Sequence, residues 1–192
     1  FYMLSLLSYA RFKDNQNLYS YILSIIWGVL SVLAKPMALS LPLILLLYDW
    51  FYSQRLTWRD IRSKIPLCIL YIPIVWITYS HFARNPLRPE LYQSALIWAW
   101  TCSFYFIKFA FPKILIPVYM LPEPVSLLNP DYLIAVLVLA ALSCSLFILR
   151  KNRWILFAFL YFYLSIFFLL RYDGQDHDLN IFADRYMYLP SL

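Results

Sequence analysis

Long apolar stretches separated by short polar connections dominate this sequence. A helix that crosses a bilayer needs about 20 largely apolar residues, with a range of roughly 17 to 25. Stretches of this length, or close to it, cover residues 1–10, 18–34, 37–52, 65–80, 132–149 and 154–170, the first being the end of a helix. The pattern predicts an all-α fold, a polytopic transmembrane helix bundle with about six spanning helices.

A seventh apolar stretch, residues 91–111, has a different pattern. Gln93, Thr101 and Lys108 recur at seven- or eight-residue spacing and place a polar stripe on one helical face, opposite aromatic side chains. This pattern favours a helix that lies in the outer interface of the membrane or is partly inserted. The alternative is an ordinary spanning helix with a few polar residues.

Composition agrees with a membrane protein. The chain is 63% hydrophobic, 20% aromatic and 14% charged, with only two glycines, which is typical of a helical bundle with interfacial aromatic side chains. The net charge of +6 raises the alternative of a nucleic acid partner, but the basic residues lie in short clusters between apolar stretches. Topology and anionic lipid explain that distribution better. Membrane lipid is therefore an expected partner, and nucleic acid is not.

No motif of a nucleotide site, a metalloprotease or a serine hydrolase is present. The three cysteines lie inside apolar stretches without CxxC spacing, and we interpret them as small buried apolar residues; they are Cys68, Cys102 and Cys144. Neither a metal nor a cofactor is predicted.

The distribution of charge predicts the orientation of the bundle. Two connections are rich in basic residues, and the positive-inside rule places both in the cytoplasm. They contain Arg55, Arg59, Arg62 and Lys64 in one case and Arg150, Lys151 and Arg153 in the other. The two connections lie on the same side only if residues 91–111 do not cross the membrane. Residues 35–36, 81–130 and 171–192 then lie outside the cytosol, in the periplasm or the lumen.

The best candidate for a functional site follows the last apolar stretch, where Asp184 and Arg185 are adjacent. Arginine matches the geometry of a phosphate group and stays charged, and a neighbouring carboxylate could orient it. Tyr186 and Tyr188 would lie at the level of the lipid headgroups. The alternative is an interfacial anchor with a local ion pair.

Two further ionisable residues lie at the ends of apolar stretches. Lys35 occupies a two-residue break near the expected outer edge, where it either neutralises a lipid phosphate or extends to water. Asp49 lies near the cytoplasmic end of the stretch 37–52. It is expected to cap that helix or to pair with Arg55.

Three segments together resemble one enzyme family. They are LAKPMALSLPLILLLYDW at residues 33–50, YFIKFAFPKILIPVY at residues 105–119 and FADRYMYLPS at residues 182–191. Their order and spacing resemble those of the transmembrane and tetratricopeptide-repeat O-mannosyltransferases and their bacterial relatives, which have a GT-C fold. The resemblance covers most of the chain. It identifies residues 1–192 as a single part of a longer bundle, with further helices expected before it and repeats after it.

The resemblance implies a glycosyltransferase in the bacterial inner membrane or the endoplasmic reticulum. Such an enzyme transfers a sugar, expected to be mannose, from a polyprenyl-phosphate donor to a protein hydroxyl on the non-cytoplasmic side. A carboxylate acts as base on the acceptor while positive groups stabilise the departing phosphate. The family's acidic motif is expected upstream of Phe1, so the base is not among these residues, and this chain alone is expected to be inactive.

The resemblance also implies roles for individual residues. Arg185 and Lys35 become candidates for binding the donor phosphate, with Asp184 orienting Arg185. Lys108 and Tyr105 are possible residues of the donor groove, together with Tyr186 and Tyr188.

Two other functions are alternatives. A transporter or flippase for lipid-linked saccharides would use similar basic residues, but it would place charges near the middle of the bilayer on facing helices. The apolar stretches here are nearly free of charge, which favours the transferase. A non-catalytic scaffold that anchors a soluble partner is the third possibility, and an acidic pair upstream would distinguish the enzyme from it.

Overall fold

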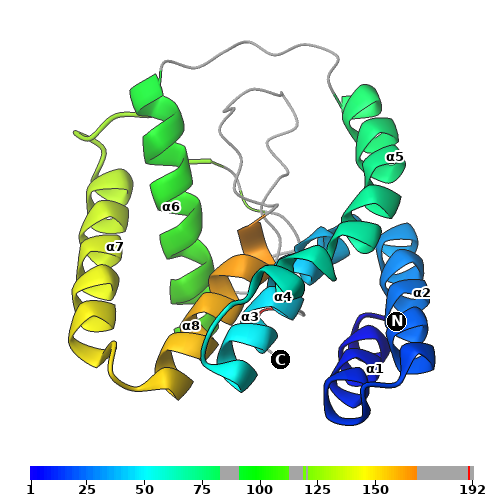
Figure 1. Ribbon diagram of the computed structural model, residues 1–192. Helices are drawn as coiled ribbons and strands as arrows, with labels where there is room; N and C mark the ends of the chain where they lie inside the picture. The colour runs from blue at the N-terminus through cyan, green and yellow to red at the C-terminus, as the bar shows by residue number, and fades with distance from the viewer. Residues whose placement is uncertain (83–90, 113–118, 120, 168–189, 191–192) are drawn as a thin grey trace. The chain divides into compact units, whose positions relative to one another are not determined.

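The computed structural model describes residues 1–82, 91–112, 119, 121–167 and 190 (Figure 1). The secondary-structure elements in this part of the chain are all helices, which confirms the all-α prediction. The chain divides into two compact units, Phe1–Ala83 and Arg84–Leu192. The first unit contains α1 (Tyr2–Asn15), α2 (Leu18–Ala34), the 3-10 helix η1 (Pro36–Ser40), α3 (Leu41–Ser53), α4 (Trp58–Arg62) and α5 (Ile65–Phe82). The second contains α6 (Leu91–Ala110), α7 (Pro130–Leu149) and α8 (Arg153–Ile166).

Small residues hold the helices of the first unit close together. The Ser5 hydroxyl of α1 donates a hydrogen bond to the Ser24 carbonyl of α2 over 2.7 Å, and Ser24 donates in return to the Ser5 carbonyl over 3.0 Å. A Cβ at Gly28 would lie 2.9 Å from the Leu67 side chain of α5. Glycine and serine allow apolar helices to approach closely, and they do so here on both sides of α2.

The break between α2 and η1 follows from proline. Pro36 has no N–H and disfavours a helical conformation in the residue before it, so α2 ends and Lys35 adopts an extended backbone. The chain then turns through η1, whose Met37 and Ala38 are buried, and continues directly into α3. This geometry brings the Lys35 side chain to the surface at the junction of two apolar helices.

The second unit is built on the pair α6 and α7, which lie side by side in Figure 1. The Ser103 hydroxyl of α6 donates a hydrogen bond of 2.7 Å to the Ala135 carbonyl of α7. Residues of α6 and α8 form an apolar cluster that contains Cys102, Tyr105, Phe162 and Ile166.

The predicted polar stripe of α6 does not form a water-facing surface. Thr101, its central residue, is fully buried, and its hydroxyl donates to the Ile97 carbonyl of the same helix over 2.7 Å. The apolar residues Ile107 and Phe109 are exposed instead. A hydroxyl that bonds to its own helix is buried at little cost, so Thr101 packs inward, while Gln93 and Lys108 are half-buried. The placement of α6 in the membrane interface stays a prediction.

Within the described residues, two helical segments are long and apolar enough to cross a membrane, Pro36–Ser53 and Pro130–Leu149, so a bundle of about six spans stays a prediction. The second carries most of its apolar side chains on the outside, among them Leu133, Ile134, Leu137, Phe147 and Ile148. Apolar surface of this extent is uncommon on soluble monomers and suits contact with lipid. Cys68 and Cys144 are exposed as well, so the prediction of buried cysteines holds only for Cys102.

Candidate functional site

Four of the predicted donor-site residues lie outside the described residues: Asp184, Arg185, Tyr186 and Tyr188. Their roles stay predictions. Lys35 is described, and its exposed side chain lies where α2 ends and η1 begins. The surface exposure of a lysine at this junction is compatible with both a phosphate ligand and an extension to water.

The two predicted groove residues of α6 differ in their surroundings. The Lys108 ammonium lies 4.4 Å from the centre of the Tyr119 ring and 5.6 Å from that of Phe104, in the range of a cation–π contact. Tyr105, in contrast, is only 1% exposed and belongs to the apolar cluster of the second unit. Its place is in the core of that unit, and a groove role for it stays a prediction.

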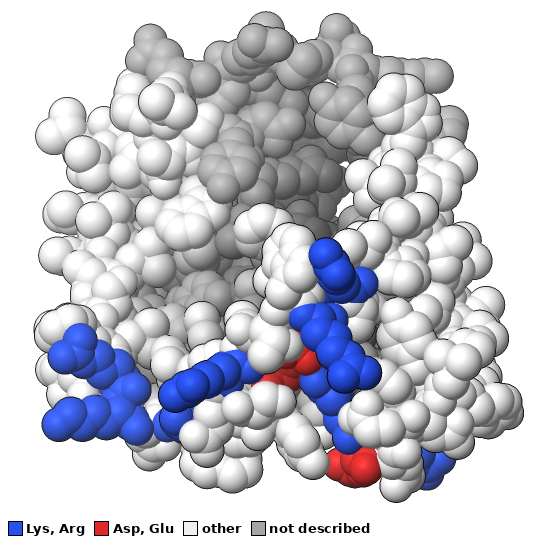
Figure 2. Space-filling model, viewed as in Figure 1, with Lys and Arg blue, Asp and Glu red and all other residues white. Residues whose placement is uncertain are grey.

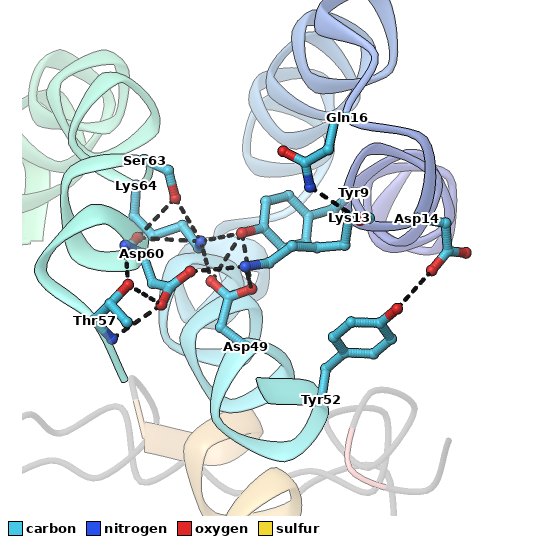
Figure 3. A network of polar contacts seen from close by, with 10 residues as sticks. All are labelled: Tyr9, Lys13, Asp14, Gln16, Asp49, Tyr52, Thr57, Asp60, Ser63 and Lys64. Carbon is cyan, nitrogen blue, oxygen red and sulfur yellow. Dashed lines mark hydrogen bonds and ion pairs between the residues drawn. The ribbon is translucent and has the colours of Figure 1, made fainter. Parts of the chain in front are cut away.

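The most developed polar site in the described part of the chain is a buried cluster in the first unit, centred on Asp49 of α3 (Figure 3). The Asp49 side chain is fully buried. Its two oxygens accept hydrogen bonds from the Tyr9 hydroxyl of α1, at 2.9 Å and 2.8 Å. Two lysines complete the surroundings, Lys13 at 2.8 Å from Oδ1 and Lys64 beside Oδ2.

Lys13 connects Asp49 to a second carboxylate. Its ammonium lies 2.7 Å from Oδ1 of Asp60, the buried acidic residue of α4. The other oxygen of Asp60 accepts from the backbone N–H of Thr57 over 2.9 Å and from the Thr57 hydroxyl. Thr57 and Asp60 thus form a capping box that fixes the start of α4.

Lys64, the residue before α5, completes the cluster. Its ammonium donates to Asp49, to the Tyr9 hydroxyl and to the Ser63 hydroxyl, the last over 2.8 Å. The ammonium also lies 4.2 Å from the centre of the Tyr9 ring. Burial lowers the pKa of Lys64, and hydrogen bonding to Asp49 opposes that shift. The lysine therefore depends on Asp49 to remain charged in this surrounding.

The charges of this cluster balance. Two lysines face two aspartates, and each charged group has several partners within it. A site for an anionic ligand needs positive charge that its own surroundings do not neutralise, and this cluster offers none. We interpret it as a staple that joins α1, α3, α4 and the start of α5.

Sequence reasoning missed this cluster. The predicted pairing of Asp49 with Arg55 was wrong, since Asp49 pairs with Lys13 and Lys64 and the Arg55 side chain is exposed. Lys64 lies in the basic connection as predicted, but unlike the three arginines of that connection it is buried. A signal was present: an aspartate inside an apolar stretch requires a cationic partner, and Lys13 and Lys64 border apolar stretches.

The pKa of Asp60 predicts how the capping box depends on pH. Burial opposes ionisation of Asp60, but hydrogen bonds from Lys13 and Thr57 outweigh it and lower the pKa from 3.8 to about 2. A carboxyl with a lowered pKa stabilises the fold above its unfolded pKa and loses that contribution as the pH falls through its folded pKa. The melting temperature of the chain in detergent should therefore exceed that of Asp60→Asn most clearly above pH 4. The difference should shrink between pH 4 and pH 2. A difference that stays constant over this range would contradict the assignment.

Among the described residues, no three His, Cys, Asp or Glu side chains are grouped so as to hold a metal ion. Comparison with known proteins adds no constraint: no family model, curated protein or solved structure matches this chain.

Proposed function

We propose that this chain is part of a multi-pass membrane glycosyltransferase of the GT-C type. It would contribute the binding site for the phosphate of a polyprenyl-phosphate sugar, with mannose as the expected sugar and a protein hydroxyl as acceptor. The proposal rests on the order and spacing of the three sequence segments that resemble the O-mannosyltransferase family. The all-helical fold and the two membrane-length helices are compatible with it.

The observation that carries the proposal furthest is the position of Lys35. It is the one cation of the first resembling segment, and its side chain is exposed at the end of the apolar segment Pro36–Ser53. A cation at such a junction lies at the depth of lipid phosphates if the segment spans the bilayer. An ammonium there can offset the negative charge that develops on a departing polyprenyl phosphate.

The buried cluster and Lys35 lie near opposite ends of the same segment. Asp49 follows Lys35 by fourteen positions, which is roughly 20 Å along a helix. Asp49 is therefore too far from Lys35 to serve as the base of a reaction at that end. The buried charges stabilise one end of the segment, and Lys35 at the other end has an exposed side chain, as contact with a donor phosphate would require.

The test is transfer of mannose from polyprenyl-phosphate mannose to an acceptor protein, in membranes that contain the longer protein to which this chain is expected to belong. Lys35→Met should lower the rate by about tenfold or more, because the leaving phosphate loses one cation. Lys35→Arg should retain most of the activity, since it keeps the charge. Gln54→Met, at the other end of the same apolar segment, is the control and should transfer normally.

If the unchanged protein transfers the sugar and Lys35→Met transfers it at the same rate, Lys35 is not part of the donor site. Absence of transfer from mannose, glucose and N-acetylglucosamine donors alike, in a protein that is inserted and folded, would contradict the glycosyltransferase proposal itself. Uptake or flipping of the lipid-linked sugar by the same membranes would then favour the transporter.

A further inference from the structure

The connection between α3 and α5 carries a basic surface that the buried cluster does not use. Arg55, Arg59 and Arg62 are exposed, and the ion pairs found within the described residues do not include them. The acidic residue of this connection, Asp60, is buried and held by Lys13 and Thr57. The fold therefore turns the negative charge inward and leaves the arginines on the outside.

Apolar side chains are interleaved with these arginines. Trp58 is 64% exposed, Leu56 is 49% exposed and Ile61 is 38% exposed. The Arg62 guanidinium lies 5.6 Å from the centre of the Trp58 ring, so the two types of side chain share one surface. We refer to Arg55, Leu56, Trp58, Arg59, Ile61 and Arg62 as the arginine–tryptophan surface.

We propose that the arginine–tryptophan surface binds the headgroups of anionic phospholipids, with Trp58 placed at the boundary between headgroups and acyl chains. Tryptophan is enriched at that boundary because its ring is apolar and its N–H is polar. Arginine forms forked hydrogen bonds with phosphate oxygens. Figure 2 shows groups of Lys and Arg side chains with few acidic side chains among them on the face that it draws, and an anionic lipid complements such a charge distribution.

The buried cluster gives this surface a fixed shape. Asp60 anchors α4 through the capping box with Thr57 and through Lys13 of α1, and Lys64 anchors the end of the connection to Asp49. Arginines of a flexible loop would lose backbone conformational freedom on binding. Arg59 and Arg62 lie on the anchored helix α4, so this entropy cost is smaller for them. The same five-residue helix α4 thus contributes Asp60 to the buried cluster and Trp58, Arg59, Ile61 and Arg62 to the arginine–tryptophan surface.

The inference needs the chain to be inserted in a membrane, which is part of the proposed function, but it does not need sugar transfer. The experiment uses the full chain reconstituted in phosphatidylcholine vesicles. The vesicles contain an increasing fraction of one lipid that is brominated near the start of its acyl chains, either phosphatidylglycerol or phosphatidylcholine. The quenching of tryptophan fluorescence by the bromine is measured at each fraction. The signal of Trp58 is the difference between the chain and its Trp58→Phe variant.

Quenching of Trp58 should reach half its maximum at a much lower fraction of the brominated anionic lipid than of the brominated neutral lipid. Each arginine near an anionic surface contributes about a fivefold gain in affinity, so replacing all three should lower the preference by on the order of 100-fold. That variant is Arg55→Gln, Arg59→Gln and Arg62→Gln. The corresponding triple lysine variant should keep most of the preference, because the electrostatic attraction remains.

The matched control removes three positive charges from the other basic connection: Arg150→Gln, Lys151→Gln and Arg153→Gln. It should leave the quenching of Trp58 unchanged. Equal quenching of Trp58 by both lipids would overturn the proposal. So would quenching of other tryptophans without quenching of Trp58, a result that would favour an acidic protein partner. Absence of quenching for every tryptophan would instead contradict membrane insertion and hence the proposed function.

Discussion

Replacing Asp49 with asparagine is expected to lower the free energy of unfolding of the first unit by about 3–5 kcal/mol, the cost of removing one partner from a buried ion pair. Asp49 is fully buried, and its carboxylate is the shared partner of Lys13, Lys64 and Tyr9. Without its negative charge, Lys64 keeps no anionic side chain within ion-pair distance among the described residues. A buried ammonium in that position must lose its proton or pull the start of α5 toward water.

Thermal or denaturant unfolding in detergent measures this effect. Asp14→Asn is the matched control, because Asp14 is an exposed aspartate of α1 whose partner is the Tyr52 hydroxyl at 3.2 Å. That substitution should change the stability by less than about 1 kcal/mol, as expected for exposed polar interactions. Equal stability of Asp49→Asn and Asp14→Asn would refute the interpretation of the cluster as a staple.

A double variant separates loss of charge balance from loss of packing. Asp49→Asn combined with Lys64→Met removes one negative and one positive charge and leaves Lys13 paired with Asp60. Buried pairs replaced together are often tolerated, whereas single removals are not. The double variant should therefore be more stable than Asp49→Asn alone. If it is less stable, hydrogen bonds of Lys64 to Tyr9 and Ser63 contribute more than its charge pairing.

Arg185→Ala is expected to lower the rate of sugar transfer by about 10²–10³-fold in the longer protein, the range found when a group that stabilises developing negative charge is removed. The expectation follows from the proposed contact between the guanidinium and the donor phosphate. Arginine offers a planar fork of donors that a lysine cannot reproduce. Arg185→Lys should therefore recover only part of the activity.

The control for this assay is Arg150→Ala. Arg150 is an exposed arginine at the end of α7, and its guanidinium lies 4.3 Å from the centre of the Phe147 ring. It belongs to the connection predicted to be cytoplasmic, so its loss should leave transfer unchanged. Normal transfer by a correctly inserted Arg185→Ala protein would make Arg185 an interfacial anchor and refute its assignment to the donor.

Much of the secondary structure follows from local signals in the sequence. The range predicted for the second helix, residues 18–34, is that of α2, and α5 begins at the predicted Ile65. Asparagine side chains accept backbone hydrogen bonds at the starts of α2, α7 and α8, and Pro36 ends α2. Caps and prolines act on neighbouring residues, so a sequence pattern is sufficient to predict them. The short helix α4 was not predicted, because five residues show no periodicity.

The choice of polar partners within the first unit depended on the tertiary structure. The sequence alone determined the apolar helices, their approximate ends and the basic connections between them. It could not show that Tyr9 bonds to Asp49, forty positions away, or that Lys13 bonds to Asp60, forty-seven positions away. Charged residues of one connection look equivalent in sequence, yet Asp60 and Lys64 are buried while Arg59 and Arg62 are exposed. The reason is physical: burial of a charge is favourable only where another segment supplies its counter-charge, and only packing of the helices decides which segments meet.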